Sequence, residues 1–150
     1  AASDVYKRQV VKPAADGLME IYLGSISEAS VCGSANTAID MGGDGTEQVL
    51  KYIYDNLDAF RLIFCNSAGT EYEDYFDRLA ETEEKFYRDF VRKYAKEPQK
   101  ISDFFIHVVC RTGWQYVFEV VSHDIPYEEA QGFMKSIREY SFAGWKRVME

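Results

Sequence analysis

The chain has 150 residues, enough for one domain with a sizeable core, and its 47% hydrophobic and 28% charged residues exclude a disordered chain. The net charge of −8 has the wrong sign for non-specific binding to nucleic acid or to an acidic lipid surface. No apolar run approaches the roughly 20 residues of a membrane-spanning helix. Cys32, Cys65 and Cys110 are odd in number and far apart, which excludes a disulfide framework and favours a cytoplasmic protein.

The first nine residues, AASDVYKRQ, resemble the translated scar of a sequencing adapter. We therefore set residues 1–9 aside as non-structural and assign the domain to residues 10–150. A gene interrupted at this point would have lost an upstream coding segment, whereas the simpler alternative is a flexible natural N-terminus.

Two segments follow in the first third of the chain. Apolar residues spaced three and four apart predict a helix over residues 10–26, although Gly17 weakens it. Residues 31–45 hold four glycines among small polar residues, and this composition predicts a loop.

The middle of the chain predicts two long helices. The first begins near Asp44 or Thr46, carries a buried stripe as far as Phe64, and ends at residues 67–69. The second covers residues 70–94, where Thr70 and Glu73 have the spacing of a capping box. We expect a solvated outer face on the second helix, formed by Glu81, Glu83, Glu84, Arg88 and Lys93.

The last third predicts helices over residues 101–122 and 127–149. The helix over 101–122 is apolar around most of its circumference, so it is expected to be buried on more than one side. The helix over 127–149 carries small residues at Ala130, Ser141 and Gly144, which would let another helix approach closely. The fold class is therefore all-α, a bundle of about five to six helices.

Several segments near the C-terminus together resemble one protein family. An apolar helix is followed by His123-Asp124-Ile125, then by residues 128–130, then by Phe142-Ala143-Gly144-Trp145, and the chain opens with VVKPAADGLMEIY. This arrangement resembles the C-terminal domain of TetR/AcrR-type transcriptional repressors over residues 10–150. The resemblance implies a repressor that binds a small-molecule effector and operator DNA, the DNA through an N-terminal helix-turn-helix that has no match in this chain.

In such repressors the last two helices usually form a four-helix dimer interface. The resemblance and the apolar character of residues 101–122 and 127–149 together predict a homodimer, and the alternative is that both helices belong to the core of a monomer. The expected interface residues are Phe105, Val109, Val117, Val120, Ala130, Met134, Ile137, Ser141, Gly144 and Trp145.

Candidate effector-binding residues fall into two groups. His107 and Arg111 share one helix face beside Trp114 and could hold an anionic or aromatic effector; the alternative is that Arg111 pairs with an acid on a neighbouring helix. The second group combines aromatic residues with a methionine, and its alternative is plain core packing: Met19, Tyr22, Phe60, Phe64, Tyr75 and Phe76.

The sequence carries no catalytic or metal-binding pattern. It lacks a phosphate-binding glycine loop, a nucleophile elbow and a Glu-x-x-His pair, and Glu119 with His123 is one pair rather than a site. We therefore expect no enzymatic activity, no cofactor and no metal. Beside the repressor domain, one alternative function is a stand-alone helical module that binds a small molecule or a protein without a DNA partner.

Overall fold

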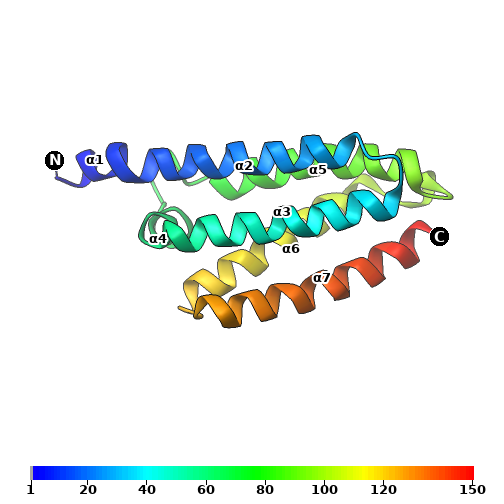
Figure 1. The fold of residues 1–150 in the computed structure, drawn as a ribbon. Helices are drawn as coiled ribbons and strands as arrows, with labels where there is room; N and C mark the ends of the chain where they lie inside the picture. The colour runs from blue at the N-terminus through cyan, green and yellow to red at the C-terminus, as the bar shows by residue number, and fades with distance from the viewer. Residues whose placement is uncertain (1) are drawn as a thin grey trace.

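The computed structural model describes the backbone of residues 2–150 and the side chains of residues 4–39 and 43–150. The chain is all-α, as expected, and no strand occurs in the described part (Figure 1). The helices are α1 (Ala2–Tyr6), α2 (Lys12–Ser30), α3 (Ala35–Asp55), α4 (Leu57–Cys65), α5 (Tyr75–Tyr94), α6 (Asp103–Ser122) and α7 (Tyr127–Met149). A π-helical turn, η1 (Lys7–Val11), joins α1 to α2, and a short 3₁₀ turn, η2 (Pro98–Lys100), precedes α6.

Residues 2–11, most of which the sequence analysis set aside, continue α2 towards the N-terminus as one helical path (Figure 1). Residue 1 lies outside the described part. The wider turn of η1 lies directly before Pro13, whose ring and missing N–H disrupt the α-helical bond to residue 9. Within η1 only Val11 is buried, and it joins the main core.

The loop expected over residues 31–45 is wrong for most of its length, because α3 begins at Ala35. Ser34 is its N-cap, and the Ser34 hydroxyl accepts a hydrogen bond from the Thr37 amide at 3.2 Å. Two of the glycines are sites of close helix packing. A Cβ at Gly43 would lie 1.9 Å from the Arg138 guanidinium carbon, and one at Gly45 would lie 1.8 Å from the Ser25 hydroxyl oxygen.

The helix expected from residue 44 or 46 to residue 64 is interrupted at Asn56. This residue leaves the helical conformation, with φ −125° and ψ 35°, and its side-chain amide donates to the Tyr52 carbonyl at 2.9 Å. The following helix also starts later than expected, at Tyr75. Thr70 and Glu73 make their local hydrogen bonds within a turn, which Gly69 enters with a φ of +74°.

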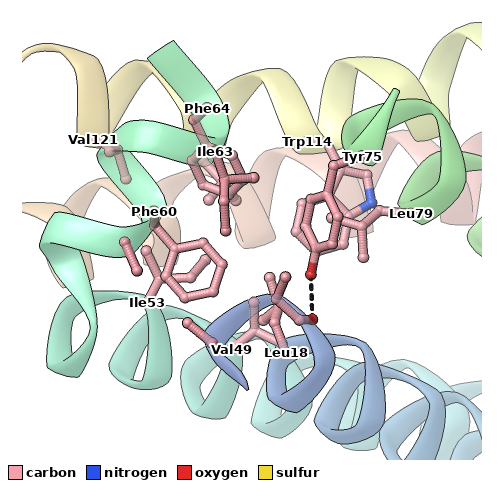
Figure 2. Packing of buried hydrophobic residues seen from close by; sticks show 14 of the residues in the cluster. Leu18, Val49, Ile53, Phe60, Ile63, Phe64, Tyr75, Leu79, Trp114 and Val121 are labelled. Carbon is pink, nitrogen blue, oxygen red and sulfur yellow. Dashed lines mark hydrogen bonds between the residues drawn. The ribbon is translucent and has the colours of Figure 1, made fainter. Parts of the chain in front are cut away.

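The main core lies between α2, α3, α4, α5 and α6 and includes Ala130 and Met134 of α7 (Figure 2). Its largest fully buried side chains include Leu18, Ile53, Phe60 and Leu79. The Tyr75 hydroxyl crosses this core and donates to the Ala15 carbonyl at 2.7 Å, which ties α5 to α2 (Figure 2). Tyrosines thereby add directional bonds between helices that apolar packing alone would not supply.

A candidate ligand cavity between five helices

A cavity of about 740 Å³ lies between α2, α3, α5, α6 and α7. This volume is within the range of pockets that hold drug-sized ligands. Most of the wall is apolar, and aromatic rings from four of these helices line it: Tyr22, Phe86, Tyr87, Phe90, Trp114 and Trp145.

The cavity exists because α7 is anchored at its two ends and bridges the space between them. Near its N-terminus, Ala130 and Met134 are buried in the main core. Near its C-terminus, Trp145 stacks on Tyr87, with ring centroids 4.8 Å apart and planes 13° apart. Between these anchors the side chains of α7 line the cavity, so α7 forms one of its walls.

Glu83 is the only acidic side chain among the described residues that line the cavity. It projects from α5 towards the crossing with α6, where its Oε2 atom lies 3.9 Å from the position of a Cβ built on Gly113. In the described part of the chain no basic side chain forms an ion pair with it. The carboxyl is therefore half-buried in the cavity wall, without a counter-charge in the described part of the chain.

Two buried donors face the Glu83 carboxyl, the Tyr22 hydroxyl and the Trp114 indole N–H. Neither is placed to complete a hydrogen bond with it or with another described group. The two rings contact each other edge to face, with centroids 5.0 Å apart. Because buried polar groups in proteins are normally bonded, this cluster of an acid and two donors is the most unusual polar feature of the cavity.

Burial is the main cause of the pKa shifts of Glu83 and the groups around it. Burial raises the pKa of Glu83 to about 8, although the facing Tyr22 and Trp114 donors reduce the rise. Burial likewise raises the pKa of Tyr22, of Tyr87 and of Cys110, and the Glu83 charge raises all three further. At neutral pH the cavity wall therefore holds Glu83 mostly as a neutral carboxylic acid.

Arg138 of α7 is the only basic side chain among the described lining residues. It lies over Gly43 of α3 and is already engaged in an interaction of its own. It is not among the groups that shift the pKa of Glu83, so the acid and the base belong to different parts of the wall.

Of the nine residues expected to bind an effector, the structure places Tyr22 and Trp114 on the cavity wall. Phe60, Phe64 and Tyr75 are buried in the main core, and Met19 and Phe76 pack against it. Phe64 and Phe76 stack on each other with centroids 4.5 Å apart (Phe64 is labelled in Figure 2).

His107 and Arg111 do not line the cavity, because α5 supplies partners for both. The Arg111 Nε atom donates to His107 Nε2 at 3.0 Å, so the imidazole proton lies on Nδ1, which donates to Glu84 Oε1 at 2.7 Å. Arg111 also pairs with Asp77, and Arg88 donates to Glu84 at 3.0 Å. This is the internal pairing that the sequence analysis considered beside ligand binding.

Most of the residues expected at a dimer interface line the cavity, although Phe105 and Gly144 are also exposed to solvent. Those on the cavity wall are Phe105, Val109, Val117, Met134, Ile137, Ser141, Gly144 and Trp145. Val120 and Ala130 are buried in the main core. Large apolar side chains of α6 and α7 are exposed as well, and of these Phe105, Tyr140, Phe142 and Val148 also border the cavity, whereas the rest lie outside it: Phe104, Val108 and Phe133.

Sequence reasoning missed Glu83 and Glu84, which it placed on a solvated face. Glu84 is 5% exposed, and Glu83 borders the cavity. A signal for Glu83 was present, since it is four residues from both Leu79 and Tyr87 and therefore shares their inward-facing stripe. The sequence analysis nevertheless placed Glu83 on the solvated face, because acidic side chains are usually exposed.

Groups of three or more His, Cys, Asp or Glu side chains that could hold a metal ion do not occur among the described residues. Within the same part of the chain no helix has the length and apolarity needed to cross a membrane. Comparison with known proteins gave no match to a family model, to a curated protein or to a solved structure.

Proposed function

We propose that this chain is the effector-binding and dimerisation domain of a TetR-like transcriptional repressor. A small organic effector would bind in the cavity, and the domain would control DNA binding by an N-terminal helix-turn-helix of the same protein. DNA contact would belong to that second domain, in keeping with the net charge of −8.

The observation that carries this proposal is the cavity itself. About 740 Å³ of space lies behind α7, which is enough for a drug-sized ligand, and it opens to solvent where Tyr140, Phe142 and Val148 are exposed. An apolar, aromatic wall with a few polar groups is the usual character of a small-molecule site.

The placement of α7 supports a regulatory role. One side of α7 lines the cavity, and apolar surface is exposed by Tyr140 and Val148 at the open edge of that cavity and by Phe133 outside it. If a partner subunit covers that surface, a ligand that moves α7 changes the relation between the two subunits. Such a ligand shifts the equilibrium only by as much as it binds one arrangement more tightly than the other.

The dimer is tested by light scattering on the whole chain across a dilution series. We expect a mass near twice that of the monomer, and we expect Tyr140→Glu to weaken the dimer at least about tenfold, because two added charges would meet in an apolar interface. Tyr140 is 71% exposed, so the monomer should tolerate this change.

The matched control is Gln131→Glu, which adds the same charge on the opposite side of α7, nine residues away. A monomer at micromolar concentration, or equal weakening by both variants, would contradict the dimer. Ligand binding by such a monomer would instead support the stand-alone binding module.

The repressor assignment has a separate test in the gene. We expect the genomic nucleotides upstream of the segment that encodes this chain to encode a helix-turn-helix in frame. An in-frame start codon with a ribosome-binding site directly before this point would contradict the repressor.

A further inference from the structure

We propose that Glu83 makes this cavity a receptor for organic cations, specifically aromatic amines or quaternary ammonium compounds, with the Glu83 carboxylate as their counter-ion. The inference deepens the proposed function, since it takes the cavity to be the ligand site and names the class of ligand.

The first support is the isolation of Glu83. A buried carboxylate is normally paired, because the cost of removing a charge from water is otherwise uncompensated. In the described part, buried Glu84 forms an ion pair with Arg88, yet Glu83, the preceding residue on α5, has none. A cationic ligand would supply the missing partner.

The second support is the ring arrangement around the carboxyl. Tyr22 from α2, Tyr87 from α5 and Trp114 from α6 are all close enough to interact with Glu83. Aromatic faces attract cations through the negative charge of their π-systems, and they pack against aromatic rings as well. The same three residues line the cavity, so a ligand there can contact both the rings and the acid.

The third support is the overall charge. The chain carries a net charge of −8, which raises the local concentration of cations and lowers that of anions. Arg138 is the one described lining residue that would oppose a cation, and it lies on α7 against Gly43 of α3, outside the groups that shift the pKa of Glu83.

The protonation of Glu83 predicts how cation binding depends on pH. The titratable and charged groups near Glu83 are Tyr22 on α2, Tyr87 on α5 and Cys110 on α6, and all three are neutral at neutral pH. From α3 the described wall residues carry no charge, and α7 supplies Arg138. Because the pKa of Glu83 is raised to about 8, a cation must displace its proton, and cation affinity should rise with pH from 6 to 9.

The experiment measures the binding of three probes to the whole chain by equilibrium dialysis. The probes share one ring and differ in charge: (2-naphthylmethyl)trimethylammonium, its neutral carbon isostere 2-neopentylnaphthalene, and 2-naphthylacetate. We expect the cation to bind at least about tenfold more tightly than the isostere at pH 8. Its affinity should increase with pH, whereas that of the isostere should stay constant.

Glu83→Gln tests the residue. We expect this variant to lose at least about tenfold in affinity for the cation, to lose the pH dependence, and to bind the isostere as before. The control is Glu81→Gln, which removes the same charge from the exposed face of α5 and should change neither affinity.

The outcomes separate the two proposals. Equal binding of cation and isostere, or equal effects of Glu83→Gln and Glu81→Gln, would overturn the cation site and leave the cavity as a ligand site. Absence of binding by all three probes would overturn both. The pH profile of the unmodified chain remains decisive even if a variant folds poorly.

Discussion

At the scale of single residues, burial decides chemistry more than residue type does. Glu83 and Glu84 are adjacent acids on α5 with different environments. Glu84 has Arg88 and His107 as partners, whereas Glu83 has two unbonded donors and a cavity. The spacing along α5 marks Glu83 as inward-facing, but the sequence could not show that Glu84 has partners, because these include His107, 23 positions away.

The raised pKa of Glu83 predicts a pH-dependent loss of stability. In the unfolded chain this carboxyl ionises near its ordinary pKa of 4.5, whereas in the folded chain it stays protonated until about pH 8. The folded state therefore loses stability progressively as pH rises from about 4.5 to 8, and the loss is constant above that. Replacement of Glu83 by Gln removes the titration.

We expect Glu83→Gln to be as stable as the unmodified chain at pH 4.5 and more stable at pH 9 by on the order of 1–3 kcal/mol. This expected difference in stability is smaller than the full pKa shift of Glu83 would give, because the carboxyl borders a cavity in which solvent can screen its charge. Urea unfolding at both pH values measures it, with Glu81→Gln as the control. A difference that does not change with pH would argue against a desolvated acid.

At the scale of helices, the spacing of apolar residues predicted most elements correctly, whereas the glycine content of residues 31–45 led to a wrong prediction of a loop. The helices expected over residues 101–122 and 127–149 agree closely with α6 and α7. The expectation of a loop over residues 31–45 was wrong because helix propensity is a weak term. Gly43 and Gly45 lower the propensity of α3, but they allow Arg138 and Ser25 to pack against its backbone.

Substitution by alanine should have opposite effects on stability at a closely packed glycine and at an unpacked one. Gly45→Ala should destabilise the chain by about 1–3 kcal/mol, because the new methyl would overlap the Ser25 side chain. Gly24→Ala on α2 should stabilise it by about 0.5–1 kcal/mol, since nothing lies within 4 Å of its Cβ position and alanine favours the helix. Urea unfolding of both variants measures the change in the free energy of unfolding. A change of the same sign in both would contradict the close contact of α2 with α3.

At the scale of the whole molecule, the cavity is a consequence of how α7 docks. Its lining residues come from five helices that are far apart in the chain, so no local pattern could identify them. The sequence analysis found the apolar surface of α6 and α7 but assigned it to a partner subunit. Much of that surface lines the cavity. Whether the remaining exposed residues meet a second subunit stays a prediction.

The C-terminal anchor of α7 can be removed selectively. Trp145 is 9% exposed and contacts Tyr87 and Phe105, so Trp145→Ala should cost about 3–5 kcal/mol. We expect the loss of hydrogen-exchange protection to concentrate in residues 137–149, while the N-terminal half of α7 stays protected. Tyr140→Ala removes an exposed aromatic ring from the same helix and should leave protection unchanged. A uniform loss of hydrogen-exchange protection along the chain would show that the two ends of α7 are not anchored independently.

The unbroken helical path from Ala2 to Ser30 has a mechanical consequence. Tyr22 lies on the cavity wall, 20 residues along this path from Ala2. The hydroxyls of Tyr52 and Tyr75 clamp the carbonyls of Ala14 and Ala15 between these two points and provide the fulcrum. At about 1.5 Å per residue, Ala15 lies roughly 10 Å from Tyr22 and roughly 20 Å from Ala2, so a tilt of about 5° that moves Tyr22 by about 0.9 Å displaces the far end by about 1.7 Å. α2 would then act as a lever that converts a sub-ångström adjustment around a ligand into motion outside the bundle.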